Sequence, residues 1–243
     1  MVDIMYYISA IGIDVSSNDV STNPKVNEKI DYEIKRKLSK IGVKAVLTNV
    51  TGDDIVITSF VPENLIEETN KIIIDILKKH AEGFDDLNGI SENPEDAGEG
   101  VSYAIAKAGS KYGDALIVSF DTYGGEDIVN EMALFVEEIG KKFGYDASSS
   151  VSNKPKKIHG VGYVGVSTDD PVVVITFEEL KELPKLAGMI FGGLLGFDGA
   201  YFVRRGTPTN ILPPGVIYTM SAFLNGNVID LYEGIRRRFN IID

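Results

Sequence analysis

A buried strand that breaks at two glycines and restarts as a helix is the feature that most constrains this fold. The apolar run Ala115–Val118 predicts the strand, which continues through Asp121 to the pair Gly124-Gly125. Beyond the glycines, apolar residues recur at three- and four-residue spacing and predict a helix up to Phe143. Strand, glycine turn and helix form half of a crossover unit, and ligands of open α/β sheets bind at the carboxyl ends of strands. The stretch therefore predicts an α/β protein with a candidate ligand site at the carboxyl end of this strand.

The first third of the chain predicts a strand, a helix, two strands and a second helix. The strand is Ile4–Val15, and the first helix covers Lys25–Ile41. The runs Val43–Val50 and Ile55–Val61, joined by turn-forming residues, predict a hairpin, and a second helix covers Glu63–Lys79. In ferredoxin-like folds such a β-α-β-β-α unit packs two helices on one face of a small sheet.

Two less regular segments separate the predicted elements of the middle of the chain. Glu82–Gly100 is acidic and is either a linker or a loop over a site, and Gly144–Lys157 is a second loop. Between them, the spacing of Val101, Ala104, Ile105 and Ala108 predicts a helix over 101–111. We therefore expect an α/β or α+β fold with mixed sheets covered by helices. It contains either two related lobes, residues 1–82 and 101–243, or a single domain.

The second half of the chain contains a segment similar to one in the first half. TDDPVVVITF (Thr168–Phe177) resembles TGDDIVITSF (Thr51–Phe60), and each predicts a turn followed by a strand. The similarity has two interpretations, a duplicated hairpin–helix module or a coincidence. Further strands are predicted over Ala200–Arg205 and Val216–Leu224, and a last helix is predicted to begin at Asn227.

Four glycines interrupt a predicted helix between Lys185 and Phe197, at positions 188, 192, 193 and 196. Glycine lowers helix propensity by roughly 1 kcal/mol each but lets another backbone approach closely. We expect this helix to pack tightly, either inside the subunit or against a second copy, so a homo-oligomer is predicted.

Charge and composition narrow the classes of partner. A net charge of -12 argues against a general nucleic-acid binder, which needs a basic surface. The absence of cysteine excludes disulfides and thiolate-ligated zinc or iron–sulfur sites. The longest apolar stretch, Leu186–Phe197, is too short to span a bilayer, and no export signal is apparent. We therefore expect a cytoplasmic protein with no membrane partner.

The end of the central strand is the first candidate site. A carboxylate such as Asp121 can hold Mg²⁺ or accept a hydrogen bond from a ribose hydroxyl, and Gly124 and Gly125 allow a substrate to approach closely. The alternative is an ordinary tight turn. Asp14 follows the first strand in the same way, and its alternative role is that of a turn former. If the two strands are neighbours, Asp14 and Asp121 converge on one metal ion or substrate.

Two arginines form the second candidate site. Arg204 and Arg205 follow a predicted strand, with Thr207 just beyond. Arginine recognises phosphate and carboxylate groups through paired hydrogen bonds. Because adjacent strand residues face opposite ways, only one of the two can point into a given pocket. A salt-bridged arginine at the surface is the alternative.

Two functions are compatible with these features. The first is a cytosolic enzyme that acts on a small anionic, nucleotide-like substrate with the help of Mg²⁺. In it Asp14 and Asp121 act as catalytic or metal-binding residues. Gly124, Gly125, Arg204, Arg205 and Thr207 contact the substrate. The second is a non-catalytic ligand-binding or assembly protein in which the acidic residues only form turns.

Overall fold

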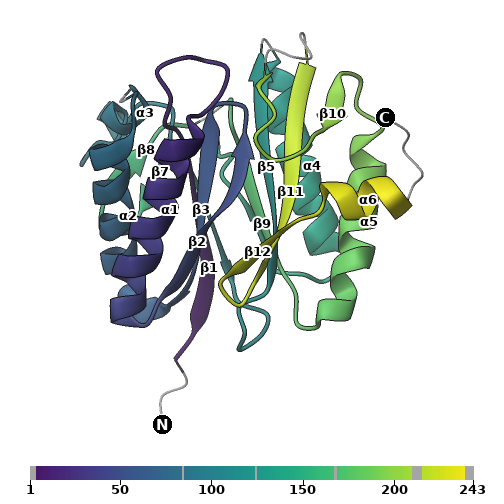
Figure 1. Cartoon of the computed structure of the whole chain (residues 1–243), viewed down its shortest axis with the longest axis horizontal. Helices are drawn as coiled ribbons and strands as arrows, with labels where there is room; N and C mark the ends of the chain where they lie inside the picture. Colours follow the sequence, from purple (N-terminus) through teal and green to yellow (C-terminus); the bar gives the residue numbers. More distant parts are fainter. Residues whose placement is uncertain (1–3, 84, 124, 167–168, 210–214, 239–243) are drawn as a thin grey trace.

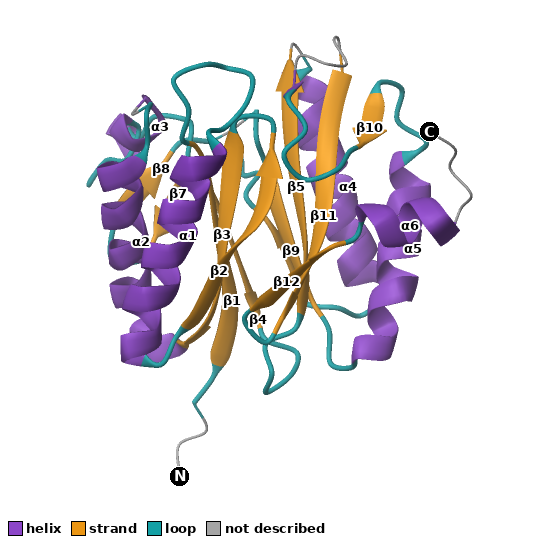
Figure 2. Ribbon diagram, in the orientation of Figure 1, coloured by secondary structure: helices purple, strands orange, loops and turns teal. Residues whose placement is uncertain are grey.

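Two β-sheets pack face to face, and helices cover the outer face of each, as Figure 1 shows for the computed structural model. The structure describes residues 4–83, 85–123, 125–166, 169–209 and 215–238. The order of layers is helix, sheet, sheet, helix (Figure 2). The fold is α/β with mixed helix and strand content, as the sequence predicts. No helix in the described part of the chain is long and apolar enough to cross a membrane.

The first sheet is antiparallel and confirms the predicted β-α-β-β-α order. Its strands lie in the order β2-β3-β1-β4. Both of its long helices pack on its outer face through a shared apolar core. The elements are β1 (Tyr6–Asp14), α1 (Pro24–Leu38), β2 (Lys44–Thr51), β3 (Asp54–Pro62), α2 (Ile66–His80) and β4 (Ser102–Lys107). Short 3-10 turns, η1 (Ser39–Ile41) and η2 (Glu63–Leu65), end α1 and begin α2.

The helix predicted over 101–111 is wrong, because β4 occupies this stretch and pairs with β1. Tyr103 packs toward the helices, whereas Ala104 and Ala106 pack toward the second sheet. Since both faces of the strand are buried, no polar alternation marks it in the sequence. The alanines that suggest a helix are instead small residues between the two sheets.

The second sheet contains the central strand of the sequence. Its strands lie in the order β10-β11-β5-β9-β6, and β12 pairs with β11 along the same edge as β10, the edge that faces away from β5. Apart from the parallel pair β10–β11, all its pairs are antiparallel. The elements are β5 (Ala115–Tyr123), α4 (Glu126–Lys142), β6 (Ala147–Ser149), β9 (Val172–Thr176), α5 (Leu183–Leu194), β10 (Ala200–Phe202), β11 (Gly215–Leu224) and β12 (Asn227–Asp230).

The strand–turn–helix of the sequence is therefore β5 and α4, and both are confirmed. Helices α4 and α5 cover the outer face of the second sheet. Asn227 does not cap the last helix, because it begins β12, and the helix α6 (Tyr232–Arg238) follows that strand. The remaining short elements are α3 (Asp85–Asn88), η3 (Pro94–Asp96), β7 (Lys156–Ile158), β8 (Gly162–Val164) and η4 (Leu180–Glu182).

Apolar and polar contacts both join the two sheets. Ile8 and Val56 of the first sheet meet Ile117 and Val174 of the second in a buried core between them. Toward β2 and β11 the contact becomes polar. There the amide of Asn49 donates to the hydroxyl of Thr219 at 2.9 Å. This hydrogen bond satisfies a buried amide of the first sheet and helps to fix the position of one sheet on the other.

The glycines of α5 play different roles. A side chain on Gly193 would collide with the ring of Phe135 on α4, so this glycine permits close packing of the two helices within the chain. Space within the chain is open around Gly188 and Gly192. The predicted tight packing is thus internal at Gly193.

Candidate metal centre

Seven aspartates gather at one end of the β-sandwich, and we call them the aspartate cluster. Neighbouring strands are antiparallel, so the end of β1 lies beside the start of β3, and the end of β5 lies beside the start of β9. The cluster collects carboxylates from these four places, from the loop after β1 and from α3. Its members are Asp14, Asp19, Asp53, Asp54, Asp86, Asp121 and Asp170.

The alternation of side chains along the strands explains why these carboxylates meet. In β1 the even-numbered residues Ile8 and Ala10 face the second sheet, and Asp14 has the same parity. In β5 the odd-numbered Ala115 and Ile117 face the first sheet, and Asp121 has their parity. Asp54 of β3 and Asp170 before β9 likewise continue the inward faces of their strands, marked by Val56 and by Val172 and Val174. The cluster is thus the polar end of the interface between the sheets.

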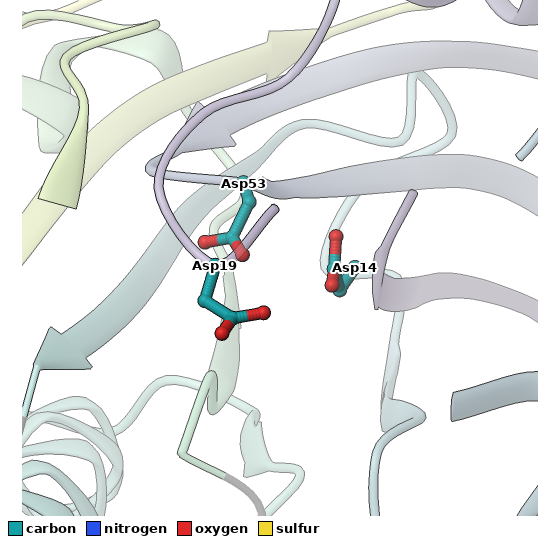
Figure 3. A group of neighbouring side chains, drawn as sticks. All are labelled: Asp14, Asp19 and Asp53. Carbon is teal, nitrogen blue, oxygen red and sulfur yellow. The ribbon is translucent and has the colours of Figure 1, made fainter. Parts of the chain in front are cut away.

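The cluster consists of three overlapping groups, in each of which one oxygen from every carboxylate lies within 4.8 Å of the others. The outer group is Asp14, Asp19 and Asp53, and Figure 3 shows it. The bridging group is Asp53, Asp54 and Asp121. The inner group is Asp54, Asp86 and Asp170. Oxygen ligands at this spacing suit hard divalent cations such as Mg²⁺, Mn²⁺ and Ca²⁺.

Local hydrogen bonds hold the outer end of the cluster. Oδ1 of Asp14 accepts from the backbone N–H of Ser16 at 2.6 Å, so Asp14 does form the turn that the sequence allowed. The backbone N–H of Asp14 donates to Oδ2 of Asp86 at 2.9 Å, which ties α3 to the end of β1. Asp14 and Asp54 lie directly opposite each other in the β1–β3 pair.

Asp121 is held by the β2–β3 turn and by the loop after β10. The hydroxyl of Thr209 donates to Oδ2 of Asp121. Gly52, in the turn, has a φ of 60°, and a side chain there would overlap both the Asp121 carboxylate and the Thr209 hydroxyl. The backbone N–H of Gly52 donates to the carbonyl of Thr207 at 3.0 Å. This turn therefore requires glycine for its conformation and for its contact with Asp121.

Burial and mutual repulsion raise the pKa values of five of these carboxyl groups. Burial, with the charges of neighbouring aspartates added, raises the pKa of Asp14 to about 7 and the pKa of Asp53 to about 6. The pKa of Asp121 rises to about 8, chiefly because of burial. Burial and the nearby aspartates also raise the pKa of Asp54 and the pKa of Asp170 well above the usual range. At neutral pH the cluster must either hold protons or bind cations that offset its charge.

Asp170 is a deeply buried member of the cluster, and one of its carboxylate oxygens has no ordinary hydrogen-bond donor. Asp170 is only 4% exposed. The hydroxyl of Ser102 donates to its backbone carbonyl at 3.0 Å and approaches Oδ1 at 3.4 Å. Oδ2 is buried and, when the carboxyl groups are ionised, has no hydrogen-bond partner among the described residues. The carboxyl group of Asp54 can form a hydrogen bond with that of Asp170 only when one of the two groups carries a proton.

The structure brings together some of the residues singled out in the sequence. Asp14 and Asp121 belong to different groups of the cluster, and both approach Asp53. Gly125 is the N-cap residue of α4 and lines a separate cavity of about 370 Å³ with Tyr201 and other residues. Gly124 lies outside the described residues.

The two arginines border a cavity of about 510 Å³ beside α1. Arg204 pairs with Glu233 at the surface, which is the salt bridge that the sequence left open as an alternative. Arg205 points inward, and one terminal nitrogen donates to the carbonyl of Leu47 at 3.0 Å. Its Nε is buried without a hydrogen-bond partner among the described residues. The hydroxyl of Thr207 donates to the carbonyl of Arg204 at 2.7 Å and supports this loop.

Three segments connect this arginine cavity to the aspartate cluster. The loop after β1 contributes Asp19 to the cluster and Thr22 to the cavity. The end of β2 and its turn contribute Asp53 and Val50. The loop after β10 contributes Arg205 to the cavity, and its Thr209 contacts Asp121 of the cluster. Cavity and cluster are therefore bordered by the same three segments, although no residue that lines the cavity belongs to the cluster.

Five members of the cluster were not singled out from the sequence: Asp19, Asp53, Asp54, Asp86 and Asp170. A signal for some of them was present. The two similar segments TGDD and TDDP each carry an Asp-Asp pair, and Asp54 and Asp170 of these pairs meet in the inner group. The pairs were interpreted as turn formers, which is their commoner role.

Comparison with known proteins places the chain in a family. The family model described as Uncharacterised conserved protein UCP005278 matches residues 7–239. The chain belongs to this family. A similar protein, the uncharacterized protein MJ1676 of Methanocaldococcus jannaschii, is 69% identical over 232 residues, which cover 96% of this chain and 98% of that protein. An uncharacterized protein of Methanothermobacter thermautotrophicus is 41% identical over 244 residues, with 98% of each chain covered.

Among solved structures, an unknown protein from Galdieria sulphuraria shares 10% sequence identity with this family member. The alignment covers 79% of this chain and 94% of that one, with a TM-score of 0.24. This degree of similarity supports no conclusion about fold or function.

Proposed function

We propose that this protein is an enzyme that uses a divalent cation, Mg²⁺ or Mn²⁺, bound by the aspartate cluster, to act on a small anionic substrate. The observation that carries the proposal is the convergence of carboxylates from both sheets on one buried place. Asp53, Asp54 and Asp121 are each less than a tenth exposed, yet their oxygens lie within 4.8 Å of one another. Such an arrangement costs folding free energy unless protons or cations offset the charge.

The arginine cavity supports the second part of the proposal, that the substrate is a small anion. Its volume of about 510 Å³ lies within the range of small-molecule pockets. Arg205 lines the cavity and its buried Nε has no hydrogen-bond partner among the described residues, while Glu28, Asp31 and Asp230 also line the cavity. A substrate anion there would lie between a guanidinium group and a cation held by the cluster. Nucleotides and sugar phosphates combine this charge with this size.

A purely structural role for the cluster is less favourable. A set of turn-forming aspartates would lie at the surface, where water solvates the charge at little cost. Asp54 and Asp170 are instead 5% and 4% exposed. Placing ionisable groups at such positions is typical of functional sites.

The test is a thermal-shift screen of nucleotides and sugar phosphates, each with and without Mg²⁺. A ligand at 100 times its dissociation constant adds about 2.7 kcal/mol to the free energy of unfolding, which raises Tm by roughly 5–10 °C for a protein of this size. We expect a hit that requires Mg²⁺ and disappears in Asp121→Asn. The exposed Asp75 of α2 offers a matched control, Asp75→Asn, in which the hit should persist.

The competing function is assembly without catalysis. A flat screen on a protein that light scattering shows to be oligomeric would favour it. If the hits were unchanged in Asp121→Asn, we would conclude that the ligand binds outside the cluster.

A further inference from the structure

We propose that the aspartate cluster holds two divalent cations, one in the outer group and one in the inner group. The proposal rests on the proposed function, since it concerns the same cluster. It adds the number of cations, their ligands and the class of substrate.

The three overlapping groups carry the first part of the argument. The outer group, Asp14, Asp19 and Asp53, shares no residue with the inner group, Asp54, Asp86 and Asp170. Each group offers three carboxylate oxygens within 4.8 Å of one another. Two complete sets of oxygen ligands are therefore present, and a cation in one set leaves the other set unused.

The groups also differ in their surroundings. Asp19 is exposed, so a cation in the outer group keeps contact with water, as Mg²⁺ prefers. Asp54 and Asp170 of the inner group are both buried. Asp170 belongs to the inner group and not to the outer one, and its buried Oδ2 has no hydrogen-bond partner among the described residues when the carboxyl groups are ionised. This buried oxygen is the second observation, independent of the acidic composition, that points to a ligand in the inner group.

Charge also favours more than one cation. One divalent cation offsets two of the seven carboxylates of the cluster. The neighbouring aspartates would then still repel one another at short range in a poorly solvated place. Two cations offset four charges, and the bridging group of Asp53, Asp54 and Asp121 lies between them.

Two neighbouring cations define a substrate class. In two-metal sites the ions clamp the attacking and leaving oxygens of a phosphoryl group. A phosphate-bearing substrate supplies oxygens to both cations and would also suit the arginine cavity next to the cluster. We therefore assign the substrate to the phosphate esters or anhydrides.

The experiment counts Mn²⁺ ions on the full chain after removal of metals with a chelator. Calorimetric titration of the wild-type protein should give two Mn²⁺ per chain, and low-temperature electron paramagnetic resonance should show the coupled spectrum of a Mn²⁺ pair. Asp19→Asn changes only the outer group, and Asp170→Asn changes only the inner group. We expect each variant to bind one Mn²⁺ with at least tenfold weaker binding of the second, and to lose the coupled spectrum. Asp75→Asn should behave as wild type.

The results separate this inference from the proposed function. One Mn²⁺ per wild-type chain, lost in Asp121→Asn, would overturn the second cation and leave a metal-dependent enzyme. No binding of Mn²⁺, or binding that none of the cluster variants weakens, would overturn both. Asp19→Asn provides a test that does not depend on the folding of a core variant, because the residue is exposed. With both sites filled, inorganic phosphate should bind to wild type more tightly than to Asp19→Asn, and equal affinity would overturn the substrate class.

Discussion

Gly52, in the β2–β3 turn of the first sheet, lies against the carboxylate of Asp121, which belongs to the second sheet. The turn needs a left-handed backbone at this position, and the carboxylate leaves no room for a side chain. One residue therefore serves both the conformation of the hairpin and the fit between the sheets. The aspartate cluster depends on this fit, because the two residues that follow Gly52 are Asp53 and Asp54, whose carboxylates lie beside that of Asp121.

Replacing Gly52 with alanine should damage both stability and metal binding. A non-glycine residue in the left-handed region costs roughly 1–2 kcal/mol. Overlap with Asp121 adds to this cost and moves the carboxylate. Gly42→Ala is the matched control, because Gly42 has a φ of 78° and no atom within 4 Å of the added carbon. Chemical denaturation should show a larger loss for Gly52→Ala, and only this variant should weaken Mn²⁺ binding. Equal losses, with Mn²⁺ binding intact, would contradict the contact.

The metal-free protein should become less stable as pH rises from about 4 to about 8. The folded-state pKa values of Asp53, Asp14 and Asp121, about 6, 7 and 8, exceed the ordinary value of 3.8. The folded chain therefore binds more protons than the unfolded chain in this window, and its stability is fully present below pH 4 and lost as pH passes the folded-state values. The rise in the pKa of Asp53 alone, from 3.8 to about 6, corresponds to roughly 3 kcal/mol, so we expect the free energy of unfolding to fall by at least about 3 kcal/mol across the window.

Divalent cations should reverse this trend, because they compete with protons for the same oxygens. Adding Mg²⁺ or Mn²⁺ should raise Tm more at pH 8 than at pH 5. Denaturant titrations at a series of pH values, with a chelator or with Mn²⁺, measure both effects. A rise in Tm that is independent of pH would mean that the cations bind elsewhere.

Arg205→Ala should weaken binding of the anionic substrate. A hydrogen bond to a charged group contributes about 1.5–3 kcal/mol, so the dissociation constant should rise roughly 10- to 100-fold. Arg204→Ala is the control, since Arg204 is engaged with Glu233 at the surface and should change binding little. Calorimetry with the best ligand of the Mg²⁺ screen gives both values. Equal effects of the two variants would place the ligand outside the arginine cavity.

Glu33→Gln should lower stability without touching the metal centre. Glu33 of α1 accepts from Lys79 at 2.8 Å and contacts His80 at 2.6 Å, both of α2, and the hydrogen bond from Lys79 is the main reason that its pKa falls to about 2. We expect a loss of about 1 kcal/mol at pH 7, since solvent screens the pair. The difference between wild type and variant should hold above the ordinary pKa of 4.5 and shrink as pH falls toward 2. Mn²⁺ binding should be unchanged.

Much of the fold could be predicted from the sequence, because local patterns decide it. The helices α1 and α2 have one apolar face, and the hairpin β2–β3 has clear turn residues. β4 could not be predicted in this way, because it is buried on both faces and rich in alanine. The order of strands in the two sheets depends on contacts between residues far apart in the chain, such as Asn49 and Thr219.

The candidate site was predicted only in part for the same reason. Asp14 and Asp121 were recognised as strand-end carboxylates, and they lie in one cluster. Their catalytic and metal-binding roles stay predictions. Asp54 and Asp170 were missed because a strand that is apolar on both faces does not indicate which of its faces meets the other sheet. Once the packing of the sheets is known, the parity of the residues along each strand identifies them.

The cluster contains residues from strands of both sheets, and this affects how the protein unfolds. The bridging and inner groups each take ligands from both sheets, since Asp54 comes from the first sheet and Asp121 and Asp170 come from the second, whereas the outer group belongs to the first sheet and its loops alone. A cation bound to the inner or the bridging group would hold the two layers together at one end. Opening of the sandwich and release of the ion would then be one event. The unfolding rate should fall with rising cation concentration, and amide hydrogen exchange should slow together in β1, β3, β5 and β9.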